Sequence, residues 1–253
     1  MSISEFITTT TPRPKQLVLS GSLPSDRAVE TIRDFLDIPS YRVVQAAEHP
    51  AIPIGRNRAT LEPADSIVSV YRESERLLTV DVERLRTAVT SEAEVIHTSG
   101  EGSGPTALIE RIGENTFETA NGTQLIVASR LIERKAHRVG GELHACFQRL
   151  SRLGGDLRTL AQYNLLASTG TVVHVYGLED HSLERLEDAT VHGGRSEELE
   201  SSWLVAYSED PTREDADAGA LLAQENNPGT YAGYWTFDPA AVADVIGYMT
   251  DSY

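Results

Sequence analysis

The first hundred residues alternate short apolar runs with amphipathic segments. The runs are rich in Val, Ile, Leu and Tyr, as β-strands are. Strands are predicted at residues 15–20, 41–47, 66–71, 77–80 and 93–97. The fourth of these follows the third closely enough to form a hairpin with it. Helices are predicted after Ser25, which is a suitable N-cap, and over residues 82–89.

The second half of the chain contains longer periodic segments. Residues 124–138 have the pattern of a helix, and Gly140 and Gly141 are suitable residues to end it. A second helix is predicted from five apolar residues at helical spacing: Leu143, Cys146, Phe147, Leu150 and Leu153. A third helix follows from Leu157 to Leu165 with the same kind of stripe.

The remaining elements are shorter. Strands are predicted at residues 171–176, 203–207 and 231–237, and a helix over residues 215–226. A last helix begins after Asp238, which is a suitable N-cap, with Pro239 in its first turn.

Strands that alternate with amphipathic helices favour an α/β fold with a mixed, largely parallel sheet flanked by helices. The Gly-rich segment 100–105 divides the chain, so we expect an N-terminal α/β lobe over residues 1–99 and a second domain over residues 105–253. A length of 253 residues fits either one large domain or two lobes. The Gly-rich segment precedes a predicted helix at residues 106–112. It lacks the full spacing of a nucleotide-binding loop, so a linker is favoured.

Composition adds a strong acidic bias. The chain has 38 acidic and 22 basic residues, and only Lys15 and Lys135 are lysines. An acidic, lysine-poor surface is typical of proteins in a halophilic cytosol, because high salt screens the repulsion between carboxylates. Replacement of Lys by Arg in a GC-rich genome is the alternative. A net charge of −16 argues against binding to nucleic acid. The sequence shows no apolar run of membrane-spanning length and no signal peptide at its start, so we expect a cytoplasmic protein without membrane association.

Charge is unevenly distributed along the second half. Residues 179–220 hold 13 acidic residues and 3 arginines, whereas residues 130–158 hold 7 basic residues and 3 acidic ones. The basic stretch either pairs with acidic side chains or forms a site for an anion.

The sequence has no nucleophile elbow, HExxH, P-loop or CxxC motif, and its single cysteine excludes an intramolecular disulfide. On the predicted helix, His144 and Cys146 would point about 200° apart and could not share a metal ion. The other histidines, His137, His174 and His192, are too far apart in the sequence to predict a site. No metal or cofactor is therefore assigned.

Two groups of residues suggest a pocket. Gln148, Arg149, Ser151 and Arg152 could hold a carboxylate or phosphate, or could instead pair with Glu133 or Glu142. The aromatic run at residues 231–237 either lines a pocket or seals a sheet edge, and Gly233 within it suggests a close approach of two backbones. Gly177 and Asp238 follow predicted strands, where ligands of open sheets bind.

Several of these segments resemble one family. The segments ASRLIE (128–133), GGELHACFQRLSRL (140–153), VHVYG (173–177) and YAGYWTFDP (231–239), together with Trp203, occur in the order found in the DICT sensory domain. The resemblance covers residues 105–253 and is to stand-alone haloarchaeal members. Cys146 departs from it, because a glycine is expected at that position.

The resemblance implies an intracellular sensory or signal-transduction protein without catalytic activity, which binds a small, anionic ligand or a signalling partner. The matching positions are candidates for a pocket or interface: Arg130, Glu133, Phe147, Gln148, Arg149, Ser151, Arg152, Gly177, Trp235 and Asp238. The alternatives are a protein-interaction or transcription-associated regulatory module without a ligand, and an enzyme with Asp238 and Glu133 as an acid–base pair. Whether the protein forms a homodimer is left open.

Overall fold

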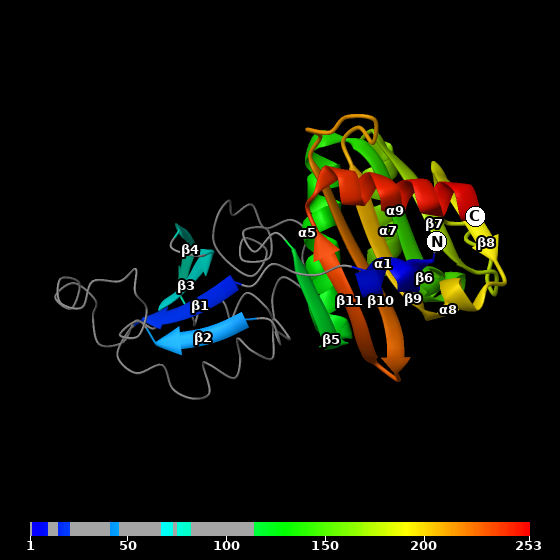
Figure 1. The fold of residues 1–253 in the computed structure, drawn as a ribbon. Helices are drawn as coiled ribbons and strands as arrows, with labels where there is room; N and C mark the ends of the chain where they lie inside the picture. The colour runs from blue at the N-terminus through cyan, green and yellow to red at the C-terminus, as the bar shows by residue number, and fades with distance from the viewer. Residues whose placement is uncertain (1, 10–14, 21–40, 46–66, 73–74, 82–113) are drawn as a thin grey trace.

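The computed structural model describes residues 2–9, 15–20, 41–45, 67–72, 75–81 and 114–253 (Figure 1). A four-stranded sheet consists of β1 (Lys15–Ser20), β2 (Tyr41–Gln45), β3 (Ile67–Arg72) and β4 (Glu75–Asp81), in the order β2-β1-β3-β4. β1 runs parallel to β2, and β3 is antiparallel to both β1 and β4. These strands, including the β3–β4 hairpin, were predicted and are confirmed.

Some predictions fall outside the described residues. These are the helices after Ser25 and at residues 82–89 and 106–112, the strand at residues 93–97, and the Gly-rich segment 100–105.

The larger sheet has seven strands in the order β5-β11-β10-β9-β6-β7-β8. Their bounds are β5 Asn115–Asn121, β6 Gly141–Arg149, β7 Thr171–Leu178, β8 Ala189–Gly194, β9 Ser202–Ser208, β10 Ala218–Asn227 and β11 Thr230–Thr236. β6, β7 and β8 are parallel, and the other neighbouring pairs are antiparallel. An α/β fold with a mixed sheet and flanking helices is thus confirmed. Parallel pairing is confined to β6, β7 and β8 at one end of this sheet, so the sheet is mixed and partly parallel rather than largely parallel. A tight turn at Gly229 makes β10 and β11 an antiparallel hairpin.

Helices cover both faces of the seven-stranded sheet (Figure 1). Their bounds are α1 Ile3–Thr9, α5 Gly122–Val139, α6 Leu150–Gly155, α7 Leu157–Ser168, α8 Glu197–Ser201 and α9 Pro239–Ser252. Side chains of α5 and α7 share one apolar cluster with one face of the sheet, and side chains of α1 and α9 share a second cluster with the other face. In α1, Ile3 is fully buried and its backbone N–H donates to Oε1 of Glu198 at 2.7 Å.

The ends of the long helices follow from local residues. Asn121 caps α5 by accepting hydrogen bonds from the amides of Thr123 and Gln124, and the Gln124 side chain accepts one from the amide of Asn121. Gly140 ends α5 with a φ of 83°. Asp238 caps α9 through a 3.2 Å bond from the amide of Ala240. The predictions for α5, α7 and α9 are confirmed.

The predicted helix through Leu143 and Leu153 is wrong, because residues up to Arg149 form strand β6 and only α6 is helical. Leu143 packs in the cluster under α5 and α7, while Cys146 packs in the cluster under α9. A strand buried on both faces shows no alternation, so its apolar residues can match helical spacing by chance.

The predicted helix at residues 215–226 is also wrong. This segment contributes strand β10, which lies between β9 and β11. Leu222 faces one cluster and Leu221 the other. Burial on both faces therefore overrides the helix propensity of Ala and Leu here.

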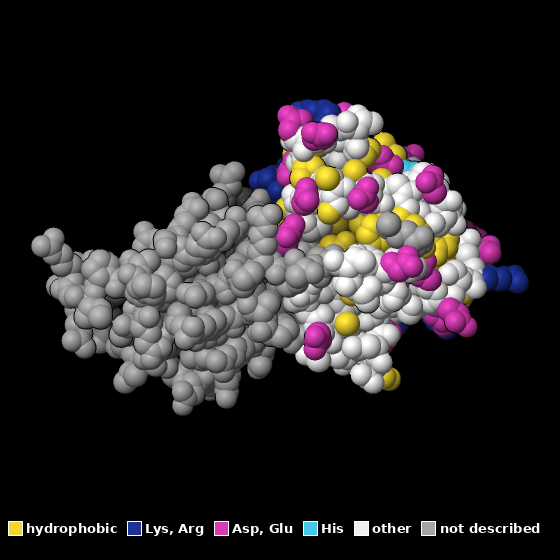
Figure 2. All heavy atoms as spheres, in the orientation of Figure 1, with side chains coloured by type: hydrophobic (Ala, Val, Ile, Leu, Met, Phe, Trp, Pro, Cys, Tyr) yellow, Lys and Arg dark blue, Asp and Glu magenta, His cyan; other side chains and the backbone are white. Residues whose placement is uncertain are grey.

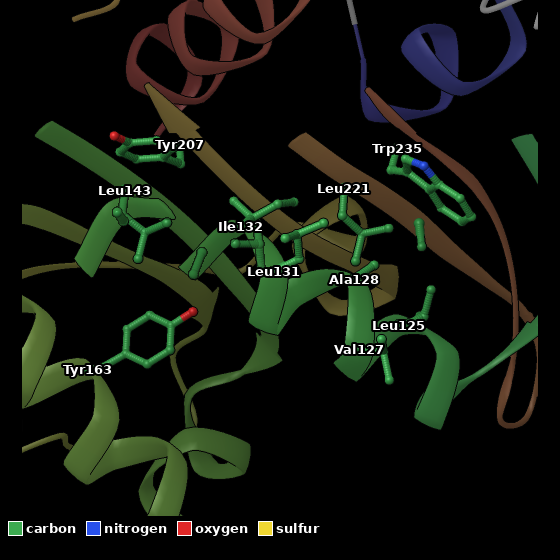
Figure 3. Packing of buried hydrophobic residues seen from close by; sticks show 14 of the residues in the cluster. Leu125, Val127, Ala128, Leu131, Ile132, Leu143, Tyr163, Tyr207, Leu221 and Trp235 are labelled. Atoms are coloured by element: carbon green, nitrogen blue, oxygen red, sulfur yellow. The ribbon is translucent and has the colours of Figure 1, made fainter. Parts of the chain in front are cut away.

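The core under α5 is closely packed. Figure 3 shows Ala128, Leu131 and Ile132 of α5 directed toward Leu221 of β10, with Tyr163 approaching from α7. The close backbone approach predicted at Gly233 is confirmed, because a Cβ atom there would lie 2.0 Å from the carbonyl oxygen of Leu222.

The described surface is acidic. On the face shown in Figure 2, Asp and Glu side chains are spread widely, whereas Lys and Arg lie near the margins. Within the described part of the chain, none of the helices has the length and apolar character needed to cross a membrane.

Candidate functional site

A pocket of about 570 Å³ lies between α5, α7 and the sheet. α5 supplies Arg130 and Glu133 to its wall, and α7 supplies Tyr163. The end of β6 and the start of α6 supply Phe147, Gln148 and Arg152, and β9 supplies Trp203. Five predicted site residues therefore line one cavity: Arg130, Glu133, Phe147, Gln148 and Arg152.

A buried carboxylate organises the inner wall of the pocket. Glu133 is only 3% exposed, and its Oε1 accepts a 2.9 Å hydrogen bond from the hydroxyl of Tyr163. Its Oε2 lies 2.7 Å from Nη1 of Arg130 and also accepts from the amide of Gln162. The second nitrogen of the Arg130 guanidinium donates to the hydroxyl of Thr159 at 3.0 Å. The carboxylate is thus fully engaged, and it fixes the arginine and the tyrosine.

The ionisation of these groups follows from burial and from their pairing. Burial would lower the pKa of Arg130, but the neighbouring charge of Glu133 raises it overall, so the guanidinium stays charged. Burial and the same carboxylate raise the pKa of Tyr163 well above its usual value. The inner wall therefore presents a charged guanidinium and a neutral phenol.

Aromatic side chains form another part of the wall. The rings of Phe147 and Tyr163 meet edge to face, with centroids 5.1 Å apart. The indole N–H of Trp203 donates to the hydroxyl of Ser129 at 3.1 Å, and its ring packs against Tyr231. The combination of aromatic walls and a few oriented polar groups is typical of sites for small molecules.

Gln148 has a left-handed backbone with a φ of 63°, which is uncommon for a residue other than glycine. The pairing of β6 with β7 shifts register between Cys146 and Arg149, so Phe147 and Gln148 both line the pocket although they are adjacent in a strand. The Gln148 amide donates to Oε2 of Glu225 at 3.0 Å and accepts from the guanidinium of Arg152. Such strain is found most often at functional sites.

Arg149 and Ser151 lie outside this pocket. Arg149 pairs with Glu200 and lies 3.7 Å from Asp180. The amide and hydroxyl of Ser151 donate to the same Asp180 at 2.9 and 2.6 Å. The alternative of ion pairing is thus correct for Arg149, but its partners are not the predicted Glu133 and Glu142.

The remaining predicted residues have structural contacts elsewhere. Gly177 lies against Leu150, where a Cβ atom would be 3.1 Å from the backbone nitrogen. Trp235 packs against Phe117, with ring centroids 5.9 Å apart. Asp238 caps α9, so the structure does not bring it together with Glu133 as an acid–base pair.

Three histidines that seemed too far apart lie on adjacent strands of the sheet. His144 is on β6, His174 on β7 and His192 on β8. His144 and His174 are paired in register, and Nδ1 of His174 lies 3.0 Å from Nε2 of His192. A sequence signal existed, because each histidine is flanked by apolar or small residues in a short β-like run. This signal was not recognised for His144, because residues 143–153 were predicted to form a helix.

Comparison of the chain with protein-family models, with curated proteins and with solved structures gave no match.

Proposed function

We propose that the protein is a non-catalytic sensor that binds a small anionic molecule in the pocket between α5 and α7. The observation that supports an anion site most directly is the position of Arg152. Its guanidinium reaches the pocket and donates to the neutral amide oxygen of Gln148. The carboxylate of Glu225 is near enough to feel the charge of Arg152 but, among the described residues, forms no salt bridge with it. A cation held by an amide, above a wall that already contains the paired Arg130, is suited to a carboxylate or phosphate group.

The groups lining the pocket favour binding over catalysis. Glu133 is occupied by three donors, and the second carboxylate of the lining, Asp156, accepts from the Thr159 hydroxyl at 2.8 Å and caps α7. Cys146 also borders the pocket, but its thiol is turned away into the α9 cluster and donates to the carbonyl oxygen of Leu199. Burial there raises the pKa of the thiol to about 12, which argues against a role as nucleophile. A candidate general base needs a free lone pair that faces the substrate, and these carboxylates are engaged.

The sensory part of the proposal rests on the resemblance of the four sequence motifs to the DICT domain. Residues of two of these motifs, Arg130 and Glu133 in the first and Phe147 and Gln148 in the second, line the pocket. In this proposal the protein acts in the cytoplasm, and the ligand changes its affinity for a signalling partner. A module that binds only a partner protein is the alternative outcome of the test.

The test uses the full chain in concentrated KCl. Native mass spectrometry after gentle buffer exchange looks for a co-purified small molecule, and thermal denaturation is repeated with inorganic phosphate, citrate and a nucleoside monophosphate at constant ionic strength. We expect at least one of these anions to raise the melting temperature.

Arg152→Ala and Arg149→Ala make a matched pair, because both remove a solvent-accessible arginine near the end of β6 but only Arg152 lines the pocket, whereas Arg149 is paired with Glu200. We expect Arg152→Ala to abolish the stabilisation by the anion and Arg149→Ala to retain it. Equal stabilisation of both variants, or a wild-type protein without any bound or stabilising anion, would contradict the proposal.

A further inference from the structure

We propose that Glu142, His144 and His174 form a binding site for one divalent transition-metal ion. The site lies on the face of β6 opposite the ligand pocket. Cys146, two residues further along the strand, belongs to the α9 cluster, whereas Leu143 and Ala145 belong to the cluster under α5. The proposal is independent of the sensor function.

The register of two parallel strands creates the site. His144 on β6 is directly paired with His174 on β7, and the two rings stack at 4.6 Å with an angle of 6° between them. Glu142 is two residues before His144, so its side chain emerges on the same face. Its Oε1 lies 2.8 Å from Nε2 of His144 and 3.6 Å from Nε2 of His174.

The spacing of the ligand atoms fits a shared ion. The ligand atoms of the three residues all lie within 4.8 Å of one another. Bonds of about 2.0–2.2 Å in a tetrahedral site place two ligand atoms about 3.4 Å apart. Rotation of the side chains, with a tilt of the two nearly parallel rings, would direct all three lone pairs onto one ion, which would replace the proton between Glu142 and His144.

The other ring nitrogens are already engaged. Nδ1 of His144 lies 2.8 Å from the hydroxyl of Tyr176, and Nδ1 of His174 lies 3.0 Å from Nε2 of His192. When each Nδ1–H donates to its partner, both Nε2 atoms carry a lone pair on the side of Glu142. Metal-binding histidines are typically oriented by such an outer hydrogen bond.

The donor set selects the class of metal. Two imidazoles and one carboxylate suit Zn²⁺, Co²⁺ or Fe²⁺, whereas Mg²⁺ and Ca²⁺ prefer oxygen ligands. Three protein ligands leave a coordination position for water or an exchangeable group.

Access and burial are consistent with an ion site. His144 is fully buried, but His174 and Glu142 are 21% and 29% exposed, so an ion can enter from their side.

The test uses the full chain, freed of metal with a chelator, at neutral pH in concentrated KCl with excess Mg²⁺ to saturate the acidic surface. Zn²⁺ is titrated by calorimetry, and Co²⁺ by its visible absorption. We expect one ion per chain and a higher melting temperature in its presence. Glu142→Gln and His174→Gln should weaken binding by more than about 100-fold, since loss of even an outer partner costs about 10–100-fold.

His137→Gln is the matched control, because the ring of His137 contacts only the hydroxyl of Thr169 among its described hydrogen-bond partners. It should bind Zn²⁺ as the wild type does. The partly exposed positions Glu142 and His174 are chosen because a change at the fully buried His144 could unfold the protein. Absence of a stoichiometric ion in the wild type would overturn the proposal, as would equal affinity of the wild type and both partly exposed variants.

Discussion

The hydroxyl of Tyr163 donates a 2.9 Å hydrogen bond to Oε1 of Glu133 and so joins α7 to α5 at the inner wall of the pocket. Tyr163→Phe removes this donor and leaves a buried carboxylate with one partner fewer. We expect the free energy of unfolding to fall by about 1.5–3 kcal/mol, the range for hydrogen bonds to charged groups. Urea denaturation measures it.

Tyr207→Phe is the control for that change. Tyr207 is equally buried, but its hydroxyl has no hydrogen-bond partner among the described residues. Removing an unsatisfied hydroxyl should leave the stability unchanged or raise it. Equal losses in the two variants would show that the bond to Glu133 contributes little.

Gly233→Ala should destabilise the sheet strongly. A Cβ atom at this position would lie 2.0 Å from the carbonyl oxygen of Leu222 and 2.7 Å from Cα of Ala223, so the central strands β10 and β11 would have to move apart. We expect a loss of about 2 kcal/mol or more, measured by thermal denaturation.

Gly247→Ala provides the comparison. This glycine lies in α9, and a Cβ atom there would meet nothing within 4 Å. Alanine in a helix is favoured over glycine, so a gain of about 0.5–1 kcal/mol is expected. A tolerated alanine at Gly233 would refute the close approach of the two strands.

Asp156→Ala should cost about 1 kcal/mol at neutral pH, because Asp156 caps α7 through the amides of Arg158 and Thr159. Burial alone would raise the pKa of Asp156, but the hydrogen bonds from Thr159 and Arg158 lower it below its usual value. The ionised cap therefore stabilises the fold above about pH 4 and loses this effect as the pH falls through the lowered pKa.

The measurement compares the unfolding free energies of wild type and Asp156→Ala at about pH 7 and about pH 3 in salt. The difference between the two proteins should shrink at the lower pH. Asp244→Ala, an exposed carboxylate within α9, should show no comparable difference at either pH. A cost for Asp156→Ala that does not change with pH would contradict ionisation as the source of the cap's strength.

Cys146 should be unreactive in the folded protein. Its thiol is fully buried and donates to the carbonyl oxygen of Leu199, and burial raises its pKa to about 12. At mildly alkaline pH a thiol-reactive disulfide reagent should label the native chain very slowly and the urea-unfolded chain at once. Rapid labelling of the native chain would mean that β6 opens readily.

Elements with local signals were predictable from the sequence. The caps at Asp238 and Gly140 are set by the residues themselves, and the strands of the first sheet are bounded apolar runs. The segments around Leu143 and Leu221 were assigned to helices because both are buried on two faces as strands. Their apolar pattern carries no period that separates the two structures.

The candidate site was predictable only in part. Arg130 and Glu133 are three residues apart on one helix, and Gln148 and Arg152 are four apart, so their proximity is a local property. Tyr163 was not predicted as a site residue. It lies on α7, and no local sequence signal shows that the fold places α7 next to α5. The pairing of His144 with His174 depends on the register of two strands that are separated in sequence by two helices, and register is set by packing of the whole sheet.

The position of α1 makes the seven-stranded unit discontinuous in the sequence. Residues 3–9 precede the strands of the smaller sheet, yet Ile3 is buried in the same cluster as Val242 and Met249 of α9. A chain shortened to residues 114–253 would uncover that apolar surface and leave Glu198 without the amide of Ile3. The two ends of the described chain are therefore thermodynamically linked, so loss of α1 should lower the stability of the seven-stranded unit.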